Sequence, residues 1–193
     1  MSAYWRIMGG HLVQDKQEHR EGALVLSTLF LTIKRHINGN LLDYGCGKGR
    51  LAHYCNPLTY LGYDINAGMV QYAQESNPDY CFTCSLAGAL AYDSDCTLLY
   101  TVISMWDDDE AQAIMHQFRS RLIVIGEIAD KRWETVGNAV PHIYNRDVEQ
   151  IDALLANAGY KRIDQRKALH ERYKSWTNDF DKFVSILVYE RAK

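Results

Sequence analysis

Apolar positions along the chain follow two alternating patterns. In residues 15–37, Leu26, Phe30 and Ile33 recur near the 3.6-residue period of a helix, which Asn38 and Gly39 end. From residue 40 onward, short apolar runs alternate with stretches of helical spacing. The predicted helices are residues 15–37, 50–55, 66–77, 107–120 and 146–159, and the predicted strands are residues 40–45, 59–65, 79–85, 95–104, 121–128, 160–169 and 183–192.

This order of elements predicts the fold class. Strands that alternate with helices form a parallel sheet covered on both faces. The last two strands, 160–169 and 183–192, have no helical pattern between them, so we expect an antiparallel hairpin at the sheet edge. The prediction is a doubly wound, mostly parallel seven-stranded α/β sheet with an antiparallel C-terminal hairpin. Residues 1–193 form one domain, in which residues 1–39 are a helical lid or cover over a Rossmann-like core of residues 40–193.

The length and net charge of the chain restrict the kinds of binding partner that we expect for the protein. The chain has 193 residues, 47% of them hydrophobic, which fits one globular domain. It has no apolar run of the roughly 18 residues that a membrane span needs, and residues 1–22 lack a basic-then-apolar signal pattern, so we expect a cytoplasmic protein. A net charge of -3 and a pI near 6.1 disfavour nucleic acid as a partner and leave a small molecule. The five cysteines, at irregular spacing, are expected to be free thiols.

A glycine-rich loop follows the first predicted strand. Gly45, Gly47 and Gly49 alternate behind Asp43 in the order D-x-G-x-G-x-G. Glycines at such a turn let the chain pass tightly from strand to helix and let a ligand contact the backbone. A plain tight turn needs one glycine rather than three. The loop therefore indicates a ligand site at the carboxyl end of the first strand.

Asp64 ends the second predicted strand. An acid at this place can accept hydrogen bonds from both ribose hydroxyls of a nucleoside, which indicates an adenine nucleoside ligand. The alternative is an acid at a helix N-terminus beside Asn66. The pairing of Asp64 with the glycine loop favours the ligand role.

The spacing of the glycines indicates which class of nucleotide ligand the loop can bind. A dinucleotide fingerprint that starts at Gly45 requires glycine at position 50, where this chain has Arg50. Asp43 is also unfavourable for an anionic pyrophosphate, whereas a ligand with ammonium or sulfonium charge tolerates it. The segment GCGKGR lacks the spacing of a phosphate-binding P-loop.

Several segments carry a family resemblance. LLDYGCGKGRLA (41–52) resembles motif I of the class I S-adenosylmethionine-dependent methyltransferases, and YLGYDIN (60–66) resembles their motif II. Residues 84–110 resemble the family stretch from the end of strand three through strand four, and residues 145–163 resemble the helix leading into strand six. The final hairpin is similar to their seventh-strand topology. The resemblance implies S-adenosylmethionine as cofactor.

The resemblance also implies roles for single residues. Asp43, Gly45 and Gly47 would surround the methionyl end of the cofactor, Asp64 would bind ribose, and Ile65 would flank adenine. The adenine-edge positions of the family match Ser85 and Leu86. Related enzymes often have aspartate where Ser85 stands, so here a hydroxyl or backbone contact would replace a carboxylate.

Candidates for the chemistry lie around this cleft. A methyl sulfonium is already activated, so the protein has to exclude water and align a nucleophile behind the carbon. Trp106 follows strand four, where an aromatic face can favour a sulfonium, or where the side chain anchors the next helix to the core. His142, Tyr144 and His11 are candidate catalytic residues, because a histidine can take the acceptor's proton. The N-terminal aromatic residues Tyr4 and Trp5 are candidates for shaping the acceptor pocket.

The acidic run after strand four has two interpretations. Asp107, Asp108, Asp109 and Glu110 resemble a cation site in composition. Consecutive helical residues point in different directions, however, and Asp107 with Glu110 has capping-box spacing. Helix capping is the favoured interpretation, and no metal is expected.

Three functions follow in order of preference. The first is methyl transfer from S-adenosylmethionine to a small-molecule or sugar-like acceptor by in-line displacement. The segment YTVISMWD (100–107) has no N/D-P-P-Y/F-like tetrapeptide, which disfavours amino-group methylation of adenine or glutamine. The alternatives are a non-catalytic sensor or partner subunit that binds S-adenosylmethionine, and an NAD(P)-dependent oxidoreductase on the same sheet.

Overall fold

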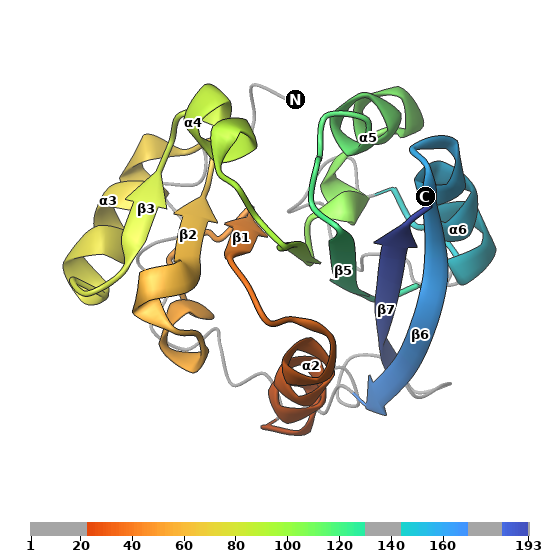
Figure 1. Ribbon diagram of the computed structural model, residues 1–193, viewed down its shortest axis with the longest axis horizontal. Helices are drawn as coiled ribbons and strands as arrows, with labels where there is room; N and C mark the ends of the chain where they lie inside the picture. The colour runs from red at the N-terminus through yellow and green to blue at the C-terminus, as the bar shows by residue number, and fades with distance from the viewer. Residues whose placement is uncertain (1–22, 130–143, 170–182, 193) are drawn as a thin grey trace, which may run out of the picture.

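The computed structural model describes residues 23–129, 144–169 and 183–192, which form one seven-stranded sheet (Figure 1). The strand order is β3-β2-β1-β4-β5-β7-β6. Strands β1 to β5 pair in parallel, and β7 pairs antiparallel with both β5 and β6. The predicted fold class, with its C-terminal hairpin, is confirmed.

The strands lie where the apolar runs predicted them. They are β1 (Leu41–Tyr44), β2 (Tyr60–Tyr63), β3 (Cys81–Thr83), β4 (Cys96–Tyr100), β5 (Leu122–Glu127), β6 (Tyr160–Leu169) and β7 (Phe183–Arg191). The α-helices are α2 (Ala23–His36), α3 (Ala67–Ser76), α4 (Leu86–Ala91), α5 (Asp108–Met115) and α6 (Val148–Asn157). Short 3₁₀ turns are η2 (Ala52–Tyr54), η3 (Pro57–Thr59) and η4 (Ile103–Met105).

Two local predictions were wrong. The helix expected over 50–55 is only the turn η2, because Asn56 begins a second turn by accepting a hydrogen bond from Leu58 N, and Pro57 cannot extend a helix from the preceding residues. The link expected after residue 85 contains α4, whose first turn is capped by the Ser85 hydroxyl on Gly88 N at 3.1 Å.

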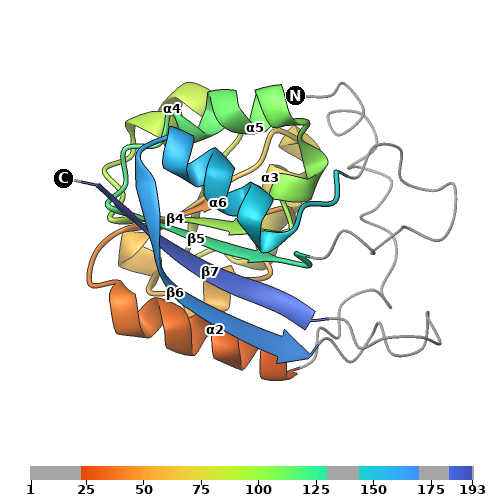
Figure 2. The same cartoon turned by 90° about the vertical axis from the view of Figure 1, so that its right-hand side faces the viewer.

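Helices cover both faces of the sheet and create two apolar layers (Figure 2). On one face α5 and α6 contribute Met115 and Ile151, which pack with Leu42 of β1. On the other face α2 contributes Leu29 and Phe30 to a separate cluster. The central strands β4 and β5 are buried on both faces, which explains why each reads as a continuous apolar run.

The N-terminal segment is described only in part. Helix α2 packs under the sheet, against β6 and β7. Residues 1–22 lie outside the described residues, so the lid function of residues 1–39 stays a prediction. Across the described parts of the chain, no helix has the length and apolar character to cross a membrane.

The sheet order brings the carboxyl ends of β1, β2 and β4 to one edge. β1 lies between β2 and β4. The chain proceeds from β1 to β2 toward one edge of the sheet, and from β4 to β5 toward the opposite edge. This reversal is a topological switch point, where open α/β sheets bind ligands. We therefore expect a ligand-binding site at this edge of the sheet.

The connection after β4 is fixed by buried polar groups. Thr101 has a φ of +55°, which costs a non-glycine residue about 1 kcal/mol or more, and its N–H donates to Gly126 O at 2.8 Å. The Ser104 hydroxyl donates to Glu127 Oε2 at 3.0 Å, and Tyr144 N donates to Ser104 O at 2.9 Å. Burial raises the pKa of Glu127, while its hydrogen bonds from Ile128 N and Ser104 act in the opposite direction.

The Arg146 side chain also fixes the connection after β4, through hydrogen bonds to its main-chain carbonyl groups. Its guanidinium donates to Ile103 O at 2.8 Å, to Trp106 O at 2.7 Å and to Asp108 Oδ1 at 2.9 Å. The side chain is 4% exposed, so these two carbonyl groups depend on it rather than on water. Arg146 thus fixes the segment from Ile103 to Trp106 against the start of α6.

We expect Arg146→Met to lower the free energy of unfolding by about 3 kcal/mol, because two buried carbonyl oxygens lose their donor. Urea unfolding of both proteins measures this difference. The control is Arg166→Met, which removes a half-exposed pair with Asp164 and should cost at most about 1 kcal/mol. Equal losses in the two variants would contradict the role given to Arg146.

Candidate functional site

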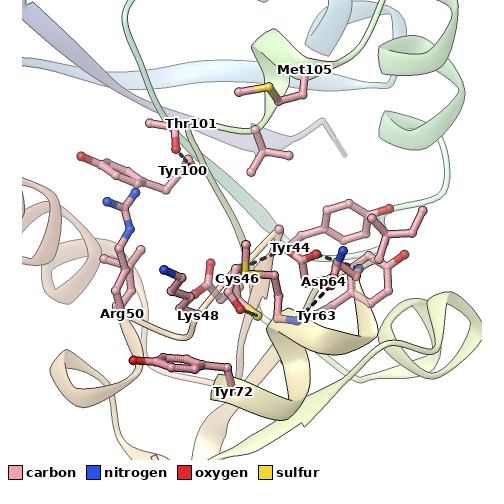
Figure 3. Close-up of a pocket in the computed structure, with 18 of the residues that line it drawn as sticks. Tyr44, Cys46, Lys48, Arg50, Tyr63, Asp64, Tyr72, Tyr100, Thr101 and Met105 are labelled. Atoms are coloured by element: carbon pink, nitrogen blue, oxygen red, sulfur yellow. Dashed lines mark hydrogen bonds between the residues drawn. The ribbon is translucent and has the colours of Figure 1, made fainter. Parts of the chain in front are cut away.

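A cavity of about 550 Å³ opens at the carboxyl ends of β1, β2 and β4 (Figure 3). Its walls come from the glycine loop, the end of β2, helix α3 and the connection after β4. The volume lies within the range of roughly 300–1,000 Å³ typical of small-molecule sites. The predicted glycine-loop site and this cavity coincide.

Two glycines of the loop serve different needs. Gly45 has a φ of +86°, and a Cβ there would lie 2.5 Å from Val102 Cγ2, so the turn has no room for a side chain. Gly47 has a φ of +53°, and a Cβ there would meet nothing within 4 Å. The backbone at Gly47 is therefore open to the cavity, as the approach of a ligand requires.

Asp64 ties the end of β2 to the glycine loop. Its Oδ2 accepts from Gly47 N at 2.9 Å, and its Oδ1 accepts from Asn66 N at 2.9 Å. Asn66 itself caps α3 by accepting from Met69 N at 3.0 Å. The local role considered for Asp64 beside Asn66 is thus present. It leaves room for a ligand role, because a carboxylate has about four lone-pair positions and two are used here.

Asp43 is buried beneath the same loop. It accepts a hydrogen bond from the Tyr60 hydroxyl at 2.8 Å. Burial raises the pKa of Asp43 to about 6, although the Tyr60 hydrogen bond and the positive charge of Arg50 oppose that rise. Asp43 is therefore a carboxyl group that changes charge in mildly acidic solution.

Aromatic rings form much of the remaining wall. The Tyr44 ring lies 4.6 Å from the Tyr63 ring and 5.8 Å from the Trp106 ring, between ring centres. All three side chains line the cavity and also belong to the buried cluster under α5 and α6. Trp106 thus packs in the core, as one interpretation expected, and also lines the cavity, while its role beside a sulfonium stays a prediction.

The other predicted site residues fall into four groups. Ile65 lines the cavity. Ser85 and Leu86 lie at the start of α4, outside the cavity lining, and the Ser85 hydroxyl is used to cap that helix. Tyr144 is 38% exposed and is anchored through its backbone next to η4. Those that lie outside the described residues are His142, His11, Tyr4 and Trp5.

The acidic run behaves as a helix cap. Asp107 accepts from Glu110 N at 2.8 Å and begins α5. Asp108 pairs with Arg146 at 2.7 Å. Within the described ranges, no group of three histidine, cysteine or acidic side chains is arranged to hold a metal ion.

Sequence reasoning missed the cationic part of the lining. Lys48 and Arg50 flank Gly49 and reach into the cavity beside Tyr72 and Tyr100 (Figure 3). The sequence could have indicated these cations, because both basic residues stand in the loop for which a ligand was predicted. Tyr72 and Tyr100 gave no signal, because each fits the apolar pattern of its own element.

Known proteins resemble this chain mainly in fold. A magnesium protoporphyrin IX methyltransferase from Synechocystis with bound S-adenosylmethionine is 17% identical, with 98% of this chain and 94% of that chain covered and a TM-score of 0.67. A 1,6-didemethyltoxoflavin-N1-methyltransferase from Burkholderia thailandensis is 12% identical, with 100% and 92% covered and a TM-score of 0.69. A methyltransferase from Methanosarcina mazei is 13% identical, with 83% and 97% covered and a TM-score of 0.67. No curated protein matches the chain.

A family model matches the part of the chain that contains the glycine loop. Residues 42–120 match the model described as a methyltransferase domain. That segment contains the glycine loop, Asp64 and the connection after β4, and so most of the residues that build the cavity. Residues 42–120 thus match a methyltransferase domain, and the described fold is shared with solved S-adenosylmethionine-dependent methyltransferases.

Proposed function

We propose that the cavity holds S-adenosylmethionine across the ends of β1, β2 and β4, and that the methyl group passes in line to a small-molecule acceptor. The observation that carries this proposal is the juxtaposition of Gly47 and Asp64. The open backbone of Gly47 and the carboxylate of Asp64 face one cavity and are joined by a 2.9 Å hydrogen bond.

The adenosyl end would lie at Asp64. The two carboxylate oxygens already hold backbone N–H groups and are therefore fixed in position, with lone pairs left for the ribose hydroxyls. Ile65 follows in the lining and would pack on adenine. Ser85 and Leu86 are proposed to lie at the adenine edge, at the start of α4, where the hydroxyl, N–H and carbonyl groups of Ser85 already form hydrogen bonds within the chain.

The methionyl end would lie over Asp43, Gly45 and Gly47. An ionised Asp43 attracts the ammonium group, and the buried Tyr60 hydroxyl holds that carboxylate in place. The glycine loop allows the ligand to approach the main chain at Gly47. The two ends of the cofactor are thereby held by the ends of neighbouring strands.

Bound S-adenosylmethionine supplies an activated methyl group, so the residues of the chain act by alignment. Trp106 and Met105 form the cavity wall after β4 and exclude water from the path of the acceptor. Arg146 keeps that wall in place through the carbonyls of Ile103 and Trp106. Tyr144 is attached to η4 beside this wall and, with His142 and His11, is proposed to position the acceptor or take its proton.

A small acceptor fits the dimensions and charge of the protein. The cavity of about 550 Å³ has to accommodate both cofactor and acceptor. The structural neighbour from Burkholderia thailandensis holds 1,6-didemethyltoxoflavin together with S-adenosylhomocysteine. The net charge of -3 gives no support for a nucleic-acid acceptor.

We expect Asp64→Asn to weaken binding of S-adenosylhomocysteine by about tenfold to a hundredfold, because hydrogen bonds to a charged acceptor contribute roughly 1.5–3 kcal/mol. Isothermal titration gives the two dissociation constants. Transfer of label from methyl-labelled S-adenosylmethionine to a small-metabolite pool should fall in parallel.

The matched control is Asp109→Asn, which makes the same chemical change at an exposed position on α5. It should leave both readouts unchanged. An Asp64→Asn protein that binds and transfers like the wild type would show that the ribose end does not lie at Asp64.

We expect cofactor binding to weaken in acid through Asp43. Its pKa is about 6, and the cofactor's ammonium group favours the ionised form, so a proton must leave Asp43 on binding below that pH. Affinity for S-adenosylhomocysteine should be highest above pH 6 and about tenfold lower at pH 5. Titrations from pH 5 to pH 7.5 test this. In Asp43→Asn the slope should flatten, and a wild-type affinity that rises in acid would refute the assignment.

A further inference from the structure

A second cavity lies at the opposite ends of the strands from the cavity proposed for S-adenosylmethionine. Helices α4 and α5 cover the same face of the sheet, and this cavity lies between the end of α4 and the residues that follow α5 (Figure 2). Leu42 and Thr97, near the amino ends of β1 and β4, also line it. Its volume of about 710 Å³ lies within the range typical of small-molecule sites.

Three hydroxyl groups meet in the lining of this cavity and are called the hydroxyl cluster (Ser94, Thr97 and Ser120). The Ser120 hydroxyl forms hydrogen bonds with the hydroxyl of Thr97 and, at 3.2 Å, with that of Ser94. Thr97 is fully buried and Ser120 is 2% exposed. Among the residues that the structure describes, these three hydroxyls have no other hydrogen bond.

The hydroxyl cluster has one proton more than its own hydrogen bonds use. Each hydroxyl group has one proton to donate and two lone pairs that can accept. Three hydroxyls therefore bring three protons, and the two hydrogen bonds between them use two. A buried donor without an acceptor costs free energy. Because all three residues line the cavity, an oxygen atom placed in it can accept the third proton.

The charges around the cavity disfavour an ionic ligand. The charged side chains of the lining are those of Asp93 and Arg119, which have opposite sign and are both exposed. The carboxyl ends of α4 and α5 point to this region, and the partial negative charge of a helix carboxyl end disfavours an anion. In the part of the chain that the structure describes, no group of three histidine, cysteine or acidic side chains is arranged to hold a metal ion.

The remaining lining is apolar. Leu42, Leu90 and Phe118 contribute aliphatic and aromatic surface next to the hydroxyl cluster. A sugar ring or a similar polyol combines apolar C–H groups, which pack on such surfaces, with hydroxyl groups that both donate and accept. That combination matches a cluster with one proton to donate and several lone pairs to accept.

We propose that this second cavity binds a small neutral molecule with several hydroxyl groups, of the sugar and polyol class, through the hydroxyl cluster. The site is separate from that of methyl transfer, and it does not depend on the cofactor placement given above. The two cavities share no lining residue, although the Phe118 ring of one lies 5.1 Å from the Tyr44 ring of the other, between ring centres. The sugar and the cofactor are therefore bound at the same time.

The test titrates the full chain at pH 7.5 with three probes that share one six-membered ring. They are D-glucose, its anionic counterpart D-glucuronate, and tetrahydropyran-2-methanol, which keeps the ring with a single hydroxyl group. Saturation-transfer NMR on each probe gives the affinity. We expect glucose to bind at millimolar concentration, about tenfold more tightly than either of the others, because the alternatives lose hydrogen bonds or add a disfavoured charge. Saturating S-adenosylhomocysteine should leave the glucose affinity within about twofold.

Variants locate the site. Thr97→Val removes one hydroxyl of the cluster with little change in volume and should weaken glucose binding about tenfold. Ala91 is exposed at the end of α4 and lines the cavity, so Ala91→Trp should block glucose without disturbing the core. The matched controls are Thr59→Val and Ala113→Trp, which make the same changes outside both cavities and should keep the wild-type affinity.

Several results would overturn the proposal. They are no saturation transfer to glucose at millimolar concentration, equal or tighter binding of either other probe, and glucose binding that survives both Thr97→Val and Ala91→Trp. Displacement of glucose by S-adenosylhomocysteine would place the sugar in the other cavity and would overturn it as well. Failure of S-adenosylhomocysteine to bind would instead contradict the proposed function, while the glucose titrations would still decide the second site.

Discussion

The glycine loop is held in place by hydrogen bonds to the end of the neighbouring strand, and the cavity depends on them. Gly45 N and Cys46 N both donate to Tyr63 O, at 2.7 and 2.9 Å. One residue further on, Asp64 accepts from Gly47 N. The turn after β1 is therefore fixed to β2 by main-chain and carboxylate contacts together. These hydrogen bonds hold the loop in the conformation that leaves the backbone of Gly47 open to the cavity.

This arrangement explains why a short sequence motif is tied to the whole sheet. The loop occupies its position only because β1 pairs with β2 on one side and β4 on the other. The wall opposite the loop comes from the connection after β4, which Arg146 and Glu127 fix through buried hydrogen bonds. Apolar packing builds the sheet, whereas these few polar contacts determine the shape of the cavity.

The sequence predicted the parts of the structure that local pattern controls. The positions of the strands followed from apolar runs, and the C-terminal hairpin followed from the lack of a helical sequence pattern between the last two strands. Asp43, Gly45, Gly47, Asp64 and Ile65 lie together because strand ends in a parallel sheet meet at one edge. Their placement needed no knowledge of side-chain packing.

The rest depended on contacts between distant segments. Arg146 lies far along the chain from Ile103 and Trp106, and nothing near it in sequence indicates that its guanidinium would bind their carbonyls. Arg50 likewise acquires its place from Tyr100 on another strand. The turn at Pro57 ended a helix that apolar spacing alone had predicted. Long-range packing and one proline account for these differences.

The most direct measurement is the shift in thermal unfolding of the wild-type protein with S-adenosylmethionine, S-adenosylhomocysteine, NAD, NADP and ATP in turn. A ligand at about 100 times its dissociation constant should stabilise the fold by roughly 2.7 kcal/mol. We expect stabilisation by the two sulfur nucleosides and none by the other three. Stabilisation by NAD or NADP instead, or by none of the five ligands, would contradict the assignment of this cavity to S-adenosylmethionine.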